Sequence, residues 1–375
     1  MDFSELWPEL TKGLANFSAG NAVMIAAGLV LIALAVLKQY EPVLLLPIGF
    51  GCILANIPLT GMLDDHGLFG VLYDAGISNE LFPLLIFVGV GAMIDFSPLL
   101  SQPKMVLLGA AGQFGIFGTL ILATLLKFPL NEAASIGVIG AIDGPTSIYV
   151  ASKLAPDLLA PIAVAAYSYM SLVPIIQPPV MRLLTTREER MIRMEYAPRP
   201  VSRRALVLFP IVVTLVIGLL VPDATPLISM LMLGNLLRES RVVERLTRAA
   251  ENEIINIATL FLGLTVGSTM TAASFLRLDT LQILILGLLA FVLDTAAGLL
   301  FGKLMSRVSG GKINPLIGAA GISAFPMAGR LAAQVAQDED FENFILMHAM
   351  GANTAGQLGS VMAGGVLLAL VTAIL

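Results

Sequence analysis

The sequence predicts an all-α protein that crosses a membrane many times. Of its 375 residues, 57% are hydrophobic and 13% are charged, whereas a soluble domain carries about 25% charged residues. Mean hydropathy is +0.90. Apolar runs of roughly 20 residues recur along the chain, which is the length of helix that spans a hydrocarbon core. We therefore expect about 11 to 13 membrane elements.

The few reactive side chains exclude several classes of site. Cys52 is the only cysteine and lies in an apolar run, which excludes disulfides and thiolate metal clusters. His66 and His348 are far apart, and neither belongs to a zinc-binding HExxH pattern. No glycine-rich phosphate loop is present, so ATP is not the expected energy source. Nothing in the sequence predicts nucleic-acid binding.

The predicted elements are apolar runs separated by more polar stretches. Residues 1–19 are polar enough to lie at the membrane surface, and the run 67–79 is short enough to be only a hairpin. The first apolar runs lie at about 20–38, 41–60, 80–98 and 103–128. After an interrupted segment they continue at about 157–181, 205–221, 224–237, 254–275, 279–302, 313–330 and 344–375.

The interrupted segment, residues 136–156, carries a single acid, Asp143, near its middle. Each flank is about ten apolar or small residues, half the thickness of a hydrocarbon core. Gly144-Pro145 follows at once, and proline interrupts a helix but suits the first turn of a new one. We expect two half-helices that meet at mid-membrane beside a carboxylate, as in transporter ion sites. The alternative is a proline kink at which Asp143 only caps the second half-helix.

An internal repeat is visible. The segment IGVIGAIDGPTSIYVASKL at 136–154 overlays IGAAGISAFPMAGRLAAQV at 317–335, with two glycines and a proline aligned. Two halves that each carry a broken span point to a binding site at their interface, and we expect the halves to be inverted. Chance similarity between glycine- and alanine-rich spans is the alternative.

The repeat divides the chain into four parts. The expected parts are residues 1–79, N-terminal membrane segments; 80–181, the first repeat with its break at Asp143-Pro145; 182–253, a basic cytoplasmic linker, two spans and an amphipathic segment; and 254–375, the second repeat with its break near Ser323-Pro326.

The second break differs from the first in its charge. Pro326 takes the place of Pro145, but Ala324 stands where Asp143 would be, and a cation, Arg330, follows one turn later. Arginine binds a carboxylate through two parallel N–H bonds, which would suit a carboxylated ligand. The alternative is an arginine that ends a helix and extends to the membrane surface.

Polar residues also follow one face of the last apolar run. Asn353, Gln357 and Ser360 are spaced at i, i+4 and i+7, so a helix places them on the same side. Such a stripe either supplies ligands or holds helices together by hydrogen bonds.

Three basic stretches orient the chain. They run from Arg182 to Arg204, from Arg238 to Arg248 and from Lys303 to Lys312, and the positive-inside rule places all three in the cytoplasm. The acidic cluster at 338–342 then lies outside if 313–330 crosses the membrane once. A re-entrant hairpin at 313–330 would place it on the cytoplasmic side instead.

Four motifs carry a family resemblance: GAIDGPTSIYVASKLAP, AVAAYSYMSLVPIIQPPVMRLLT, INPLIGAAGISAFPMAGR and LMHAMGANTAG. In this order they closely resemble the membrane β subunit of the sodium-pumping, biotin-dependent decarboxylases, which include oxaloacetate, methylmalonyl-CoA and glutaconyl-CoA decarboxylases. Weaker similarity covers nearly the whole chain. The resemblance implies a multi-pass protein of the inner (plasma) membrane of a prokaryote.

The resemblance also implies site residues. The Asp of the DGPT motif and the Asn of the HAMGxN motif, here Asp143 and Asn353, are associated with Na⁺ in the family. The second Tyr of YSYM, here Tyr169, is assigned a role in proton or Na⁺ movement. The other functional positions, of which the last two would contact carboxybiotin, correspond to Asn314, Gly318, Ser323 and Arg330.

The sequence departs from the family pattern at two places. The enterobacterial members carry a longer insertion after the second span, which is absent here before Glu80. Asp294 lies within an apolar run where the resemblance predicts an uncharged residue. It is either an ion ligand or an acid that packs between helices, and we favour packing.

The resemblance implies a pump that is driven by decarboxylation. A partner subunit with biotin-carrier and carboxyltransferase parts would deliver carboxybiotin, whose decarboxylation consumes a proton and drives Na⁺ outward. A small single-span subunit and further copies of the β subunit would complete the complex. This sequence has neither a biotin-acceptor motif nor a carboxyltransferase domain, so we expect the substrate acid to be chosen elsewhere. The residues alone fit a Na⁺-coupled secondary carboxylate transporter equally well.

Overall fold

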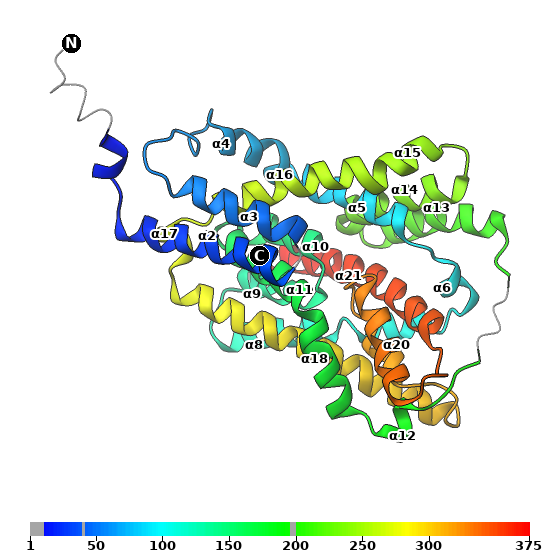
Figure 1. Ribbon diagram of the computed structural model, residues 1–375. Helices are drawn as coiled ribbons and strands as arrows, with labels where there is room; N and C mark the ends of the chain where they lie inside the picture. The colour runs from blue at the N-terminus through cyan, green and yellow to red at the C-terminus, as the bar shows by residue number, and fades with distance from the viewer. Residues whose placement is uncertain (1–10, 40–41, 196–199) are drawn as a thin grey trace, which may run out of the picture.

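The computed structural model describes residues 11–39, 42–195 and 200–375, so the first ten residues of the expected surface segment lie outside it. The described chain consists of helices and their connections, without a strand (Figure 1). The prediction of an all-α fold is therefore confirmed.

Five stretches of the described chain are long and apolar enough to cross a membrane as helices. They are Ala19–Lys38 (α2), Met105–Leu125 (α7 and α8), Arg203–Leu220 (α13), Leu278–Val308 (α18) and Leu346–Ile374 (α21). Two bent pairs of helices raise the number to seven if each pair is one span. The expected number of elements is higher because several apolar runs form shorter helices. For example, α3 (Pro42–Ala55) has 14 residues, about 21 Å of helix against a core of about 30 Å.

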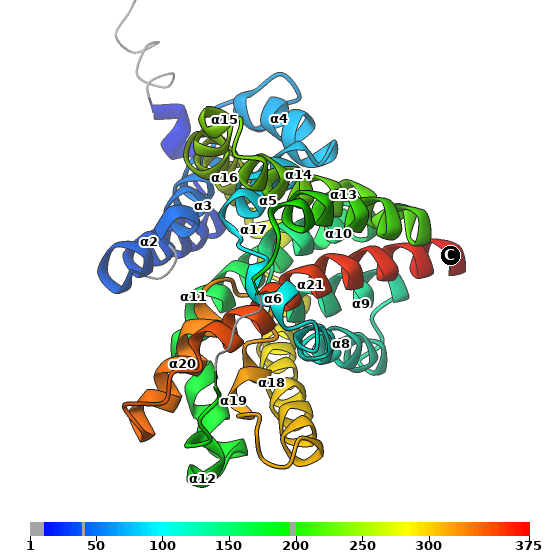
Figure 2. The same ribbon diagram turned by 90° about the vertical axis from the view of Figure 1, so that its right-hand side faces the viewer.

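Six helices pack side by side in one layer, which we call the helix row. In spatial order the row consists of α2, α3, α16 (Ile255–Ser268), α5 (Leu81–Met93), α14 (Thr225–Ser240) and α13. Figure 2 shows the row along the upper side of the molecule. Large apolar side chains such as Leu37 and Leu219 are exposed on it, which indicates a surface that faces lipid.

The second layer, the core bundle, contains both interrupted segments. It comprises α7 (Met105–Ala111), α8 (Phe114–Leu125), α9 (Leu130–Gly137), α10 (Gly144–Leu154), α11 (Leu159–Leu184), α18, α19 (Leu316–Ala319), α20 (Met327–Glu339) and α21. Short elements make the connections: α4 (Leu68–Leu72), α6 (Ser97–Ser101), α12 (Arg187–Arg190), α15 (Glu244–Ala249), α17 (Ala272–Phe275), π-helical turns at Tyr73–Ser78 and Ala250–Ile254, and 3₁₀ turns at Val138–Ala141, Pro156–Leu158 and Pro222–Ala224.

The first interrupted segment breaks where the sequence predicts. α9 passes into the 3₁₀ turn Val138–Ala141, and Ile142 adopts a left-handed conformation with φ 53°. Asp143 is the N-cap of α10, with a proline in the first turn. Nearly every side chain of α10 is buried, so protein rather than lipid surrounds the free backbone groups of the break, as a bilayer requires.

The second interrupted segment has a longer break. α19 has only four residues, and α20 begins at Met327 after Pro326, which confirms the break that was predicted near Ser323-Pro326. α20 packs against α11 and α21, and α10 packs against the same two helices. Two structurally related halves of the chain would place α10 and α20 in such equivalent surroundings. The inverted repeat itself stays a prediction.

The second interrupted segment runs from Asn314, just before α19, to Asn343, just after α20, and both of its ends lie on the same side of the molecule. The amide nitrogens of Asn314 and Asn343 donate to the same two carbonyls, Arg190 O and Ile192 O, over 2.9–3.2 Å. Since both ends meet one linker, the segment enters and returns. Of the two topologies that the sequence allows, the re-entrant hairpin is therefore the one that the structure has.

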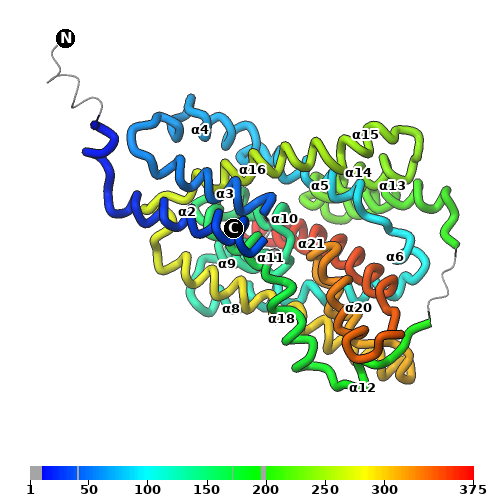
Figure 3. Tube along the Cα trace, viewed as in Figure 1, coloured from blue at the N-terminus to red at the C-terminus, as the bar shows by residue number. Residues whose placement is uncertain are grey.

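The end of α20 lies beside the basic linker around α12 (Figure 3). Ion pairs join the acidic cluster to this linker. The pairs are Arg182–Asp338 (2.8 Å), Arg187–Glu339 (3.3 Å), Arg190–Glu339 (2.7 Å), Arg193–Asp340 (2.6 Å) and Arg193–Glu342 (2.9 Å). Lys303 pairs with Glu189 at 3.0 Å, which brings the third basic stretch to the same place. The acidic residues thus face the linker rather than the opposite side of the membrane.

The Arg190–Glu339 pair makes the stability of this end depend on pH. The hydrogen bond from Arg190 holds the pKa of Glu339 below its usual value. A carboxylate with a lowered folded-state pKa stabilises the protein above its unfolded-state pKa, about 4.3, and loses that effect as the pH falls through the folded-state value. We expect Glu339→Gln to lower the Tm in detergent at pH 7, with the difference from the wild type shrinking below about pH 4. Equal Tm values at pH 7 would contradict the role of this pair.

Candidate functional site

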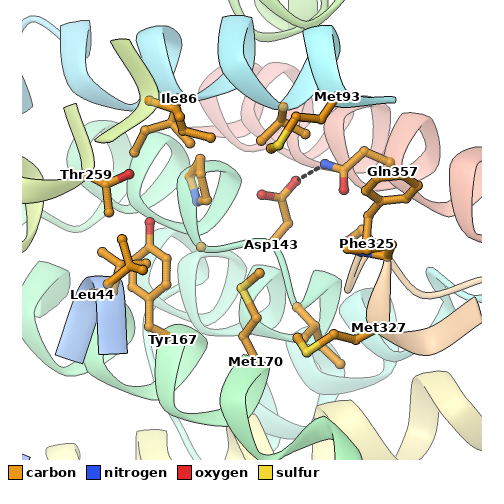
Figure 4. Close-up of a pocket in the computed structure, with 18 of the residues that line it drawn as sticks. Leu44, Ile86, Met93, Asp143, Tyr167, Met170, Thr259, Phe325, Met327 and Gln357 are labelled. Atoms are coloured by element: carbon orange, nitrogen blue, oxygen red, sulfur yellow. Dashed lines mark hydrogen bonds between the residues drawn. The ribbon is translucent and has the colours of Figure 1, made fainter. Parts of the chain in front are cut away.

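A cavity of about 690 Å³ lies between the helix row and the core bundle. This volume is within the range of small-molecule sites, about 300–1,000 Å³. α3, α5 and α16 line it on one side, and both breaks, α11, α20 and α21 line it on the other. Figure 4 shows Ile86 and Met93 on one side of Asp143 and Met170 and Met327 on the other, with Leu44 beside Tyr167. The structure therefore places a cavity at the meeting point of the two broken segments, where the repeat predicts a site.

Asp143 presents its carboxylate to this cavity while α21 and α10 hold it in place. Oδ2 accepts hydrogen bonds from Thr146 Oγ1 (2.7 Å), Gln357 Nε2 (3.0 Å) and Ser360 Oγ (3.0 Å). Oδ1 accepts only a long bond of 3.5 Å from the Thr146 N–H, and it points towards the middle of the cavity in Figure 4. One oxygen is thus fixed by donors and the other remains able to bind a ligand.

The tyrosine beside Asp143 is Tyr167, not Tyr169. The Tyr167 ring lines the cavity and packs so closely on Gly144 that a Cβ there would lie 2.0 Å from Cε1. Only glycine fits at that position. The Tyr169 hydroxyl instead donates to the carbonyl of Leu284 in α18. Both residues belong to the YSYM motif, in which the resemblance assigns a role only to Tyr169, and only the packing shows that Tyr167 lies at the cavity.

Ser323 joins the two breaks. Its hydroxyl donates a hydrogen bond to the carbonyl of Ala141, the last residue of the 3₁₀ turn that precedes Asp143. Ser323 also lines the cavity. A hydroxyl of the second interrupted segment therefore satisfies a free carbonyl of the first, two residues from the carboxylate.

Arg330 lines the same cavity from the first turn of α20. It is exposed, and its guanidinium forms neither a hydrogen bond nor an ion pair with another residue of the described chain. All of its donors are therefore available to an anion that enters the cavity.

The polar side chains on one face of α21 contact both breaks: two bind at the first break and one binds at the second. Gln357 and Ser360 bind Asp143, while Asn353 Nδ2 donates to the carbonyl of Ile322 at 2.7 Å. Asn353 Oδ1 is buried without a hydrogen-bond partner in the described chain. The stripe was visible in the sequence as an i, i+4, i+7 spacing, but its partners depend on how the two hairpins dock on α21.

Two further expected site residues lie away from the cavity. Asn314 binds the linker carbonyls described above, and its Oδ1 accepts the N–H of Leu316 at 3.0 Å. Gly318 packs on Gly298 of α18, where a Cβ would lie 2.0 Å from the Gly298 carbonyl oxygen. Neither is among the residues that line the cavity. Their roles in the reaction stay predictions.

The comparisons with known proteins agree on one family. The family described as "Na+-transporting oxaloacetate decarboxylase beta subunit" matches residues 20–371. The chain belongs to this family. The beta subunit of methylmalonyl-CoA decarboxylase from Veillonella parvula is 56% identical to it over 361 residues, 96% of both chains. The beta subunit of glutaconyl-CoA decarboxylase from Acidaminococcus fermentans is 55% identical over 360 residues, also 96% of both. The oxaloacetate decarboxylase beta chain of Klebsiella pneumoniae is 47% identical over 422 residues, 96% of this chain and 97% of the relative.

Membership of the family identifies the chain as the β subunit of a Na⁺-translocating decarboxylase. Decarboxylation coupled to Na⁺ transport is the activity of such a subunit, and its relatives are subunits of larger complexes. The apolar helices described above agree with a multi-pass membrane protein. The resemblance that the four sequence motifs carry is therefore confirmed.

The side chains around Asp143 suit Na⁺ as the transported ion. No cluster of three or more His, Cys, Asp or Glu side chains that could hold a metal occurs in the described chain. A cation bound at Asp143 itself would meet that carboxylate and neutral oxygens, while a second carboxylate, Asp95, lines another part of the cavity. Such a donor set suits a hard, singly charged ion better than a transition metal, which prefers nitrogen or sulfur ligands.

Asp294 has a structural partner in this β subunit. Its Oδ1 accepts the N–H of Gly115, at the start of α8, where the helix α7–α8 is interrupted and N–H groups lack helical partners. Asp294 is fully buried and does not line the cavity. This contact supports the packing role that we favour from the sequence, which stays a prediction.

Proposed function

We propose that this β subunit decarboxylates carboxybiotin carried by a partner subunit and uses the free energy to move Na⁺ outward, with consumption of a proton. The single observation that carries this proposal is the cavity that holds both an acid, Asp143, and an unpaired cation, Arg330. The first suits a small hard cation and the second suits a carboxylate. A carrier of Na⁺ alone would not need the arginine.

The decarboxylation itself needs little from the protein. The bond between the ureido nitrogen of biotin and the carboxyl carbon breaks, CO₂ leaves, and its bonding electrons stay on the nitrogen, which takes up a proton. Arg330 binds and orients the carboxylate at the cavity. Methionines such as Met93, Met327 and Met350, which line the cavity, provide an apolar and adaptable surface for the fused rings of biotin. Removal of the carboxylate from water favours the loss of neutral CO₂.

The coupling rests on Asp143. Its carboxyl group holds a proton or contributes to a Na⁺ site, because a protonated carboxyl is a poor ligand for a cation. Entry of Na⁺ therefore releases a proton at the place where decarboxylation consumes one. Asn353 and Tyr169 are the further residues that we propose for the Na⁺ and proton steps. Asn314, Gly318 and Ser323 support the site from the second interrupted segment.

The proposed complex contains a biotin carrier with a carboxyltransferase, a small single-span subunit and more than one copy of this chain, in the inner membrane of a prokaryote. The named relatives decarboxylate methylmalonyl-CoA, glutaconyl-CoA or oxaloacetate. We propose a carboxylic acid or acyl-CoA of this kind for the whole complex, with the choice made by the carboxyltransferase.

Affinity purification from the native membrane tests this proposal. We expect a tagged chain to recover a biotinylated polypeptide, which streptavidin detects, together with a small membrane subunit. The purified complex should decarboxylate carboxybiotin faster when Na⁺ is added. If the isolated chain in vesicles instead moves a dicarboxylate together with Na⁺, and no biotinylated protein accompanies it, the chain is a secondary carboxylate transporter.

A further inference from the structure

The break in the second interrupted segment leaves backbone carbonyls without helical partners. α19 ends at Ala319 and α20 begins at Met327. The backbone hydrogen bonds of this turn do not use the carbonyls of Ala319, Gly321 and Ile322. Inside a membrane protein such groups need a donor from elsewhere, because the surrounding hydrocarbon supplies none.

A side-chain amide from a different part of the core bundle reaches each of these carbonyls. The pairs are Gln177 Nε2 to Ala319 O (2.7 Å), Gln113 Nε2 to Gly321 O (3.3 Å) and Asn353 Nδ2 to Ile322 O (2.7 Å). The three amides come from α11, from the turn between α7 and α8, and from α21. All three side chains are buried, at 0 to 4% exposure. We call them the amide girdle.

Gln113 and Gln177 have the chemistry that such a position requires. An amide donates N–H bonds without adding a charge, whereas Lys or Arg would bring a buried cation. The two N–H groups of the Gln113 amide are shared among three acceptors, because Gly109 O (3.1 Å) and Gly356 O (3.2 Å) also lie within hydrogen-bond distance of Nε2. Gln113 therefore ties the second break to α7 and α21 as well.

We propose that Gln113 and Gln177 are positioning residues for the decarboxylation site: they hold the turn at 319–322 and so fix Ser323 and Arg330 at the cavity. Ser323 follows the turn directly, and Arg330 lies one turn into α20. Loss of one amide frees a buried carbonyl, which pairs again only if the turn moves. The inference rests on the proposed function for the reaction that it serves.

Kinetics of the complex provide the first test. Each of Gln113→Leu and Gln177→Leu removes a donor at similar size, and we expect either to lower kcat/KM for decarboxylation about tenfold or more. Gln334→Leu is the matched control, since Gln334 lies on α20 and is exposed away from the turn. Wild-type kcat/KM in both girdle variants would overturn the proposal.

The pH dependence of activity in Gln177→Glu shows whether the hydrogen bond, rather than the packing of the side chain, is what matters. It also provides a test if a leucine variant does not fold. In Gln177→Glu the introduced carboxyl can donate to Ala319 O only when it is protonated. We expect the activity of Gln177→Glu, relative to the wild type at the same pH, to rise as the pH falls. A ratio that does not change with pH would contradict the hydrogen bond as the cause.

Thiol labelling tests the turn without the reaction. The single native cysteine, Cys52, is buried with 0% exposure, so Met327→Cys in the cavity wall supplies the one accessible thiol. We expect Gln177→Leu to change its rate of labelling severalfold, and Gln334→Leu to leave the rate unchanged. Unchanged labelling in Gln177→Leu overturns the inference. A changed rate in a chain that decarboxylates nothing would uphold the girdle and reject the proposed function instead.

Discussion

Asp143→Asn abolishes Na⁺-stimulated decarboxylation in the assembled complex. We expect the rate at saturating Na⁺ to fall at least about a hundredfold, because removal of a residue that only supports a metal ligand already lowers metal affinity or activity about 10- to 100-fold. The substitution removes the charge but little else. Asn is as good an N-cap as Asp, and its side-chain oxygen can still accept from Gln357 and Ser360. The fold and the assembly of the complex should therefore survive.

The measurement is the decarboxylation rate as a function of Na⁺ concentration at several pH values. In the wild type, the apparent affinity for Na⁺ should fall as the pH drops through the pKa of this carboxyl, because a proton then competes for the same oxygens. Asp279→Asn is the matched control, since Asp279 is an acid at the exposed start of α18 that pairs with Arg277 at 2.8 Å. Normal activation by Na⁺ in Asp143→Asn would mean that Asp143 serves only as the N-cap of α10. Asp294 would then be the next candidate for the Na⁺ ligand.

Replacement of Arg330 raises the KM for carboxybiotin. Lys keeps the charge but loses the planar pair of N–H donors, so we expect about a tenfold increase in Arg330→Lys and a larger one in Arg330→Ala. The Na⁺ concentration that gives half-maximal rate should change much less, because Asp143 and its donors are left in place. The assay follows CO₂ release at varied carboxybiotin and fixed Na⁺.

A second arginine supplies the comparison for this experiment. Arg307 is exposed near the end of α18 and is not part of the cavity wall, so Arg307→Ala should leave the KM unchanged. An unchanged KM in Arg330→Ala would mean that Arg330 only anchors α20 at the membrane surface, the alternative that the sequence leaves open.

The local breaks could be predicted because proline acts through its own backbone. Pro145 and Pro326 each lie at the start of a helix in the structure, because proline disfavours a helix that continues through it. The effect is a tendency, since Pro47 and Pro210 lie inside helices of the same chain. The acid at the first break and the polar stripe of α21 were also visible as local patterns. The family followed from long motifs in a fixed order.

The partners of these residues could not be predicted, because they belong to helices far apart in the sequence. Asn353 Nδ2 donates to the carbonyl of Ile322, while Gln357 and Ser360 donate to Asp143. Gln113 and Gln177 are isolated polar residues within apolar runs of the sequence. A polar amide within an apolar run indicates that the side chain needs a hydrogen-bond partner, but the sequence does not show which residue that partner is.

The sequence by itself determined the class of protein, the places where two helices break and the family, because hydrophobic run length, proline and ordered motifs act locally. The tertiary structure alone decided that the chain from Asn314 to Asn343 returns to the side it came from, since these two residues bind the same linker carbonyls. It also decided that a helix row faces the core bundle across one cavity. Both features depend on which apolar helix surfaces pack against each other. The hydrophobic effect is non-directional, so one sequence does not show which surfaces will pair.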